Sequence, residues 1–174
     1  ILLISYILSL VMKAPNLILV MFLVLNCSDE VEFRSPSFEA QKDGAVFWNA
    51  NFLAADIDNN GFIIEGRNSG EKLQLITSSE SNGVFELSGD SDNVAIYVDT
   101  NGTVFSTKNV PDPNISIFPK FGEINIENVD NENPRNISGT FWFYAYTEDG
   151  LNSINFNEGV FYKIPLLGGL ERIE

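Results

Sequence analysis

The segment Ile137-Ser-Gly-Thr-Phe-Trp-Phe-Tyr-Ala-Tyr-Thr147 carries the clearest sign of how this chain folds. Side chains of two kinds alternate along it, and Phe141 and Phe143 fall on the same side. Successive side chains of a strand point to opposite faces of a sheet, so this period of two predicts a strand with one buried face. The segment 123–127 repeats the alternation and predicts a second strand of the same kind.

Shorter runs rich in β-branched and aromatic residues recur after Asp43, and Asn-Gly or Asp-Gly pairs separate several of them. Such pairs adopt the positive φ that tight hairpin turns require. Short sequential strands joined by tight turns predict a single all-β domain, either an antiparallel β-sandwich or a meander-like barrel. The shorter strands are expected at 45–53, 62–65, 72–78, 84–87, 94–99, 103–107, 154–157 and 160–164.

The N-terminal part has the pattern of a secretion signal. An unbroken apolar run from Leu17 to Leu25 follows Lys13 and is shorter than the roughly 20 residues that a spanning helix needs. It stops just before Cys27, the only cysteine of the chain. This arrangement resembles the signal peptide of bacterial lipoproteins, in which the cysteine becomes the lipidated first residue, although Asn26 stands where Gly, Ala or Ser is usual.

A transmembrane anchor formed by residues 1–25 is the alternative. Pro15 interrupts that segment, and Lys13 would place a charge at its middle at a cost of about 2.5–3.5 kcal/mol, so the anchor is disfavoured. The expected organisation is a segment upstream of the true start at 1–11, a start at Met12, a lipoprotein signal peptide at 12–26, an acidic lipidated tether at 27–37 and the all-β domain at 38–174.

The residues after the cysteine predict a location. Ser28-Asp29-Glu30 resembles the acidic export tag of surface-exposed lipoproteins. One acyl chain binds a membrane only marginally, whereas two or more anchor stably, and a bacterial lipoprotein carries more than one. We therefore expect an exported outer membrane lipoprotein, exposed at the cell surface and held in the membrane by lipid such as palmitate on Cys27.

Acidic residues dominate the charge, with 24 Asp and Glu against 10 Lys and Arg and a formal net charge of −14. This argues against nucleic-acid binding, which needs a basic surface. The chain has no histidine, which removes Ser-His-Asp and Cys-His nucleophile systems. A pair of carboxylates could still act as acid and base, as in glycosidases, but no pair stands out, and we expect no enzymatic activity.

Five segments follow one another along the domain: Asp43-Gly-Ala-Val-Phe-Trp48, Gly83-Val-Phe-Glu-Leu87, Gly122-Glu-Ile-Asn-Ile126, Ile137-Ser-Gly-Thr-Phe-Trp-Phe143 and Ile154-Asn-Phe-Asn-Glu-Gly-Val-Phe161. In this order, and behind a lipoprotein start, they resemble a family of uncharacterised Bacteroidetes-type lipoproteins with a small all-β domain. The resemblance covers roughly residues 38–166. It implies a fold and a location, and it implies no activity.

One polar segment has the opening half of a calcium loop. Asp56, Asp58 and Asn60 alternate before Gly61, and oxygen ligands at such positions can converge on one ion. Arg67 occupies the twelfth position, where a bidentate Glu is needed, so a polar hairpin turn is the favoured interpretation. We expect no cofactor, and calcium at these three residues is the alternative.

Three aromatic residues share the side of the first segment opposite to its two phenylalanines. Trp142, Tyr144 and Tyr146 would form a row on one face of the sheet, where their rings could stack on sugars and hydrogen-bond at their edges. A second layer could equally cover that face and make them core, or the row could contact a protein. Trp48 lies in a segment with the same alternation of side chains, and it is expected in the core.

These observations predict a lipid-anchored envelope protein without catalytic activity. Its expected role is to bind an envelope protein or an extracellular polymer. The first alternative is a glycan-binding accessory protein that uses Trp142, Tyr144 and Tyr146, and the second is a carboxylate-based hydrolase.

Overall fold

The computed structural model describes residues 36–112, 114, 122–131 and 133–173. Cys27 and the predicted signal peptide lie outside these residues. No helix in the described part of the chain is long and apolar enough to cross a membrane. The regular elements there are the strands β1 (Ser37–Lys42), β2 (Val46–Asn49), β3 (Phe52–Asp58), β4 (Gly61–Asn68), β5 (Glu71–Ile76), β6 (Gly83–Leu87), β7 (Val94–Val98), β8 (Val104–Ser106), β9 (Gly122–Asp130), β10 (Asn136–Tyr146) and β11 (Ser153–Pro165).

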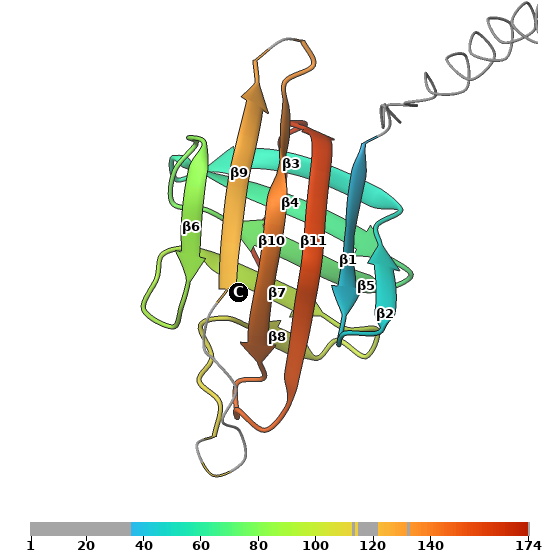
Figure 1. The fold of residues 1–174 in the computed structure, drawn as a ribbon, viewed down its shortest axis with the longest axis vertical. Coiled ribbons are helices and arrows are strands. Elements are labelled where there is room, and N and C mark those ends of the chain that lie inside the picture. Colours follow the sequence, from blue (N-terminus) through green and yellow to red (C-terminus); the bar gives the residue numbers. More distant parts are fainter. Residues whose placement is uncertain (1–35, 113, 115–121, 132, 174) are drawn as a thin grey trace, which may run out of the picture. The chain divides into compact units, whose positions relative to one another are not determined.

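The strands form one curled antiparallel sheet that folds over itself into two layers (Figure 1). The front layer contains β6, β9, β10, β11, β1 and β2 in spatial order, and the back layer contains β3, β4, β5, β7 and β8. In Figure 1 the back-layer strands cross behind those of the front layer. Strand β10 joins the layers, because it pairs with β9 along most of its length and with β8 at Tyr146.

A second junction lies beyond the end of β11. Leu166 forms a parallel bridge with Ala55 of β3, and the Leu167 amide donates to the Ala55 carbonyl oxygen at 2.9 Å. The two layers are therefore joined both at β10 and beyond the end of β11, and the curled sheet forms a half-barrel. The prediction of an all-β antiparallel domain is confirmed.

The prediction of a single strand at 45–53 was wrong. Strand β2 ends at Asn49 and β3 begins at Phe52. Between them the Ala50 amide donates to the Phe38 carbonyl and the Asn51 amide donates to the Arg67 carbonyl, both at 2.9 Å. These two bonds lead the chain from the front layer to the back layer, and the apolar pattern alone does not show the crossing.

The main core lies between the two layers. Phe141 and Phe143 are buried as their spacing predicts, and Trp48 is also buried. Aromatic rings from three strands of the front layer meet there: Phe38 of β1 contacts Phe141 of β10 at 5.4 Å between centroids and Trp48 of β2 at 5.6 Å, both edge to face. Large aromatic side chains account for much of the apolar surface that this domain buries.

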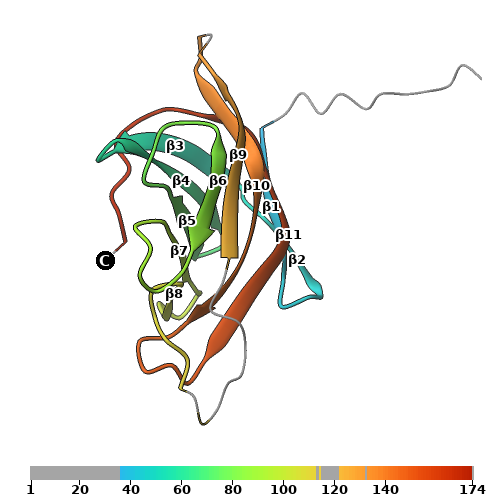
Figure 2. The ribbon, with the colours of Figure 1, turned by 60° about the vertical axis from the view of Figure 1, so that its left-hand side comes forward.

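Part of the outer face of the back layer is covered by the C-terminal segment, residues 166–173 (Figure 2). Its side chains Leu170 and Ile173 pack on a second apolar cluster. Glu65 lies beside it, fully buried, and accepts hydrogen bonds from Arg67 and Gln74, both at 2.6 Å. A buried carboxylate is stable only with such partners. The second cluster consists of Ile63, Ile76, Val94 and Ile96.

Candidate functional site

Trp142 stands on the outer face of the front layer, with 39% of its surface exposed. On one side it pairs with Glu123 of β9. On the other side the register of β10 and β11 shifts, so that both Asn157 and Glu158 of β11 oppose it. Glu158 has a φ of 51°, and this local bulge turns the strand. The bulge of β11 and the regular pairing with β9 together place polar side chains on both sides of one exposed indole.

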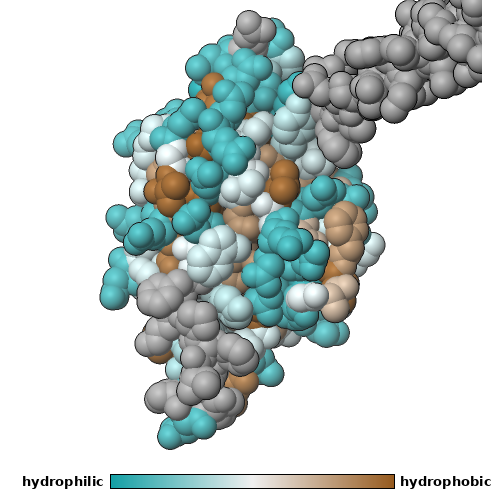
Figure 3. Space-filling model, in the orientation of Figure 1, coloured by the Kyte–Doolittle hydropathy of each residue, from teal (hydrophilic) through white to brown (hydrophobic). Residues whose placement is uncertain are grey.

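These residues line a shallow hollow of about 450 Å³. The Glu158 carboxylate is held in place, because the Gln41 amide donates to it at 2.7 Å. Figure 3 shows this face as mostly hydrophilic, with hydrophobic side chains in separate patches. Carboxylates, an amide and a hydroxyl around an indole can exchange hydrogen bonds with a ligand rich in hydroxyl groups while the ring stacks on it. The hollow is lined by Glu123, Thr140, Trp142, Asn157, Glu158 and Val160.

The predicted aromatic row does not stay on one accessible face. Tyr144 is half-buried and Tyr146 is only 1% exposed. Tyr146 lies where β10 passes from β9 to β8, so the back layer is joined to the sheet at this residue. Tyr146 is thus buried, as in the alternative that makes the row part of the core, whereas Trp142 is exposed, as in the alternatives in which the row contacts a ligand or a protein.

Sequence reasoning missed the polar half of this hollow. Asn157 and Glu158 read as ordinary strand residues in an alternating pattern, and only the register of β11 brings both opposite Trp142. A signal was present in Gly159, whose position permits the close approach of the Phe141 ring: a Cβ there would lie 2.5 Å from it. Glycine inside a strand often marks a bulge.

The predicted calcium ligands Asp56, Asp58 and Asn60 either bind donors of the protein itself or lie in a turn. Asp56 accepts hydrogen bonds from the amides of Ile57 and Leu170 at 2.7 and 3.0 Å. Asp58 pairs with Arg172. Asn60 and the residue before it have φ of 65° and 50°, as a tight hairpin turn requires. Among the residues that the structure describes, no three acidic, histidine or cysteine side chains are grouped to hold a metal.

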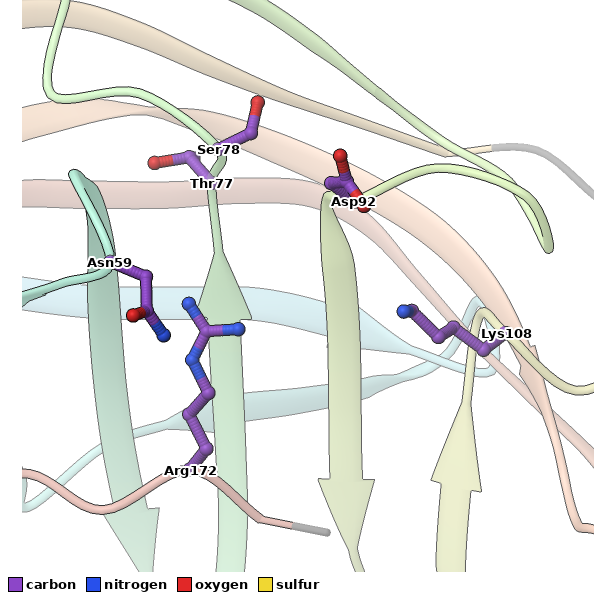
Figure 4. Close-up of a pocket in the computed structure, with 6 residues that line it drawn as sticks. All are labelled: Asn59, Thr77, Ser78, Asp92, Lys108 and Arg172. Atoms are coloured by element: carbon purple, nitrogen blue, oxygen red, sulfur yellow. The ribbon is translucent and has the colours of Figure 1, made fainter.

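A second hollow, of about 310 Å³, opens at the end of the back layer (Figure 4). Figure 4 shows Arg172 directed toward Asn59 and Thr77, with Lys108 on the far side of Asp92. Arg172 is already paired with Asp58. The opposite charges around this hollow largely balance each other, so it selects neither anions nor cations.

A partly buried ionisable cluster links the two layers. The Lys42 ammonium of β1 pairs with Glu71 of β5 and donates to the Tyr97 hydroxyl of β7 at 3.0 Å. Tyr97 donates to Glu71 at 2.5 Å. Burial opposes the ionisation of Glu71, but the hydrogen bonds from Lys42 and Tyr97 outweigh it and lower the pKa of Glu71. Burial and the adjacent carboxylate raise the pKa of Tyr97, so the cluster holds one charge pair and a neutral phenol at neutral pH.

Comparison with curated proteins and with solved structures found no match. A family model described as "Domain of unknown function (DUF6252)" matches residues 34–165. The match spans every strand from β1 to β11, including the hollow around Trp142. The chain therefore belongs to the DUF6252 family.

Proposed function

We propose that this protein is a non-catalytic binding lipoprotein of a Bacteroidetes-type outer membrane. Lipid on Cys27 anchors it, the acidic tether at 27–37 spaces it from the membrane, and the outer face of the front layer binds an envelope protein or an extracellular polymer. The apolar run that stops just before the only cysteine supports the anchor. The exposed indole of Trp142 in its hollow supports the binding face.

The chemistry of the hollow favours a glycan as the ligand. The cores of protein interfaces are depleted of charged residues, whereas Glu123 and Glu158 stand on either side of Trp142. A sugar ring offers an apolar face for the indole and hydroxyl groups for the surrounding carboxylates and amide. This combination suits a saccharide better than the apolar side chain of a partner protein.

Replacing Trp142 with alanine is expected to abolish glycan binding while the domain stays folded, because the exposed indole contributes little to the core. The measurement is a glycan-array screen of the full-length chain in detergent, with circular dichroism to verify folding. Tyr146→Ala is the matched structural control, and burial of that ring predicts a loss of about 3–5 kcal/mol in the free energy of unfolding.

The other outcomes of this screen separate the alternatives. Glycan binding that survives Trp142→Ala would place the site elsewhere. A folded wild-type chain that binds no glycan would favour an envelope protein, to be identified by cross-linking in intact membranes. Turnover of a saccharide that is lost in Glu123→Gln or Glu158→Gln would instead show a hydrolase.

Replacing Cys27 with serine is expected to abolish lipid attachment, since a hydroxyl cannot take the place of the thiol to which the lipid is joined. The measurement is the incorporation of radiolabelled palmitate in the producing bacterium, together with partition into detergent. Ser28→Ala is the control and should keep the label. Labelling of Cys27→Ser, or no labelling of the wild type, would contradict the anchor.

A further inference from the structure

A second exposed aromatic ring shares the face of Trp142. Phe47 of β2 is 66% exposed, while its neighbour Trp48 is buried in the core. Because successive side chains of a strand alternate between faces, the burial of Trp48 places Phe47 on the outer face of the front layer. The two exposed rings, Phe47 and Trp142, therefore lie on the same face of the same layer.

The strand register places both rings on one line across the sheet. Phe47 pairs with Gln41 of β1, and Gln41 pairs with Asn157 of β11, which opposes Trp142. On the far side, Trp142 pairs with Glu123. Three steps between neighbouring strands, of about 4.8 Å each, separate Phe47 from Trp142 by about 14 Å. We call this line the cross-strand row; it consists of Phe47, Gln41, Asn157, Glu158, Trp142 and Glu123.

We propose, on the basis of the proposed function, that the cross-strand row binds an uncharged linear polysaccharide that lies across the strands. One sugar ring stacks on Trp142 and a later ring of the same chain stacks on Phe47. Gln41, Asn157 and Glu158 lie between the two rings and hydrogen-bond the hydroxyl groups of the intervening sugars. A single sugar is too short to reach both rings.

The charge of the row sets the class of polysaccharide. Glu123 and Glu158 belong to it, Glu39 lies beside it on β1, and it includes no Lys or Arg side chain. A chain of uronic acids or sulfated sugars would meet like charge without a partner, which costs free energy when the site is desolvated. The net charge of −14 also slows the approach of a polyanion.

The row is also unlike the centre of a protein interface. The two exposed rings are separated by amide and carboxylate side chains, so no continuous apolar patch joins them. A protein partner that covered this line would bury Glu158 with its hydrogen bond from Gln41, whereas hydroxyl groups of a sugar can replace the water around both.

The test is isothermal titration of the full-length chain in detergent with uncharged oligosaccharides from monosaccharide to hexasaccharide. Cello-, manno- and xylo-oligosaccharides are the probes, and oligogalacturonate is the charged comparison. Phe47→Ala is expected to leave the affinity for a disaccharide unchanged and to weaken that for a hexasaccharide by roughly tenfold or more, because the two contacts act through one chain. Trp142→Ala is expected to abolish both.

The matched control is Phe52→Ala. Phe52 is 40% exposed, much like Trp142, but it lies in the back layer and stacks on Arg67 at 4.8 Å. Its loss should leave every affinity unchanged. The cross-strand row would be overturned if Phe47→Ala changed the affinities for short and long oligosaccharides equally or changed neither. It would also be overturned if the wild-type chain bound oligogalacturonate as tightly as the uncharged oligosaccharides. In each case the Trp142 site would stand. An absence of any oligosaccharide binding would overturn the glycan function itself.

Discussion

Replacing Phe38 with alanine is expected to lower the free energy of unfolding by about 3–5 kcal/mol. The ring is fully buried and meets Trp48, Phe141 and Phe161 edge to face, at 5.6, 5.4 and 6.3 Å between centroids. The backbone at Gly66 lies against the same ring, since a Cβ there would be 2.7 Å from it. Backbone lies on one side of the Phe38 ring and large rings on the others, and these groups cannot collapse into the cavity that the substitution leaves. The loss of stability should therefore lie toward the upper end of this range.

Urea denaturation followed by tryptophan fluorescence measures this change, because Trp48 contacts the altered ring. Phe47→Ala removes the same side chain from the neighbouring strand β2, where the ring is exposed, and should change stability by no more than about 0.5 kcal/mol. A similar loss in both variants would mean that Phe38 does not occupy the core as described.

The parts of the fold that follow from local pattern could be predicted from sequence. Phe141 and Phe143 alternate with polar and aromatic neighbours over a whole strand, and the period of two gives both the strand and its buried face. Trp48 follows the same rule. The all-β class needs only many such segments separated by turn pairs, and it required no knowledge of how the strands are ordered.

The parts that depend on strand register could not be predicted. The hollow around Trp142 exists because β11 bulges at Asn157 and Glu158, and nothing in the alternation of β11 gives its register with β10. Tyr146 has the sequence environment of an exposed row, yet it is buried where β10 joins β8. Pairings between residues far apart in the chain decide both results.

The role of the C-terminal segment could not be predicted either, because beyond its bridge to Ala55 it contacts the sheet through single hydrogen bonds and apolar side chains and has no strand pattern. Leu170 and Ile173 pack on the second apolar cluster, and the Ile173 amide donates to the Gln74 side chain at 2.9 Å. Gln74 in turn donates to the Glu171 carbonyl at 2.7 Å and to the buried Glu65. The segment thus shields both apolar surface and a charged group from water.

Truncation after Leu166 is therefore expected to lower the free energy of unfolding by about 3 kcal/mol, since it exposes the second apolar cluster and removes the two side chains that cover it. Thermal or urea unfolding measures the loss of stability.

Arg172→Ala is the contrasting variant. Both side chains of its ion pair with Asp58 are more than a third exposed, so the pair should contribute at most about 1 kcal/mol. The double change of Leu170 and Ile173 to alanine should reproduce most of the effect of truncation, because it removes apolar contact and keeps the backbone hydrogen bonds. If Arg172→Ala matched the truncation instead, the ion pair rather than the apolar contact would hold this segment on the back layer.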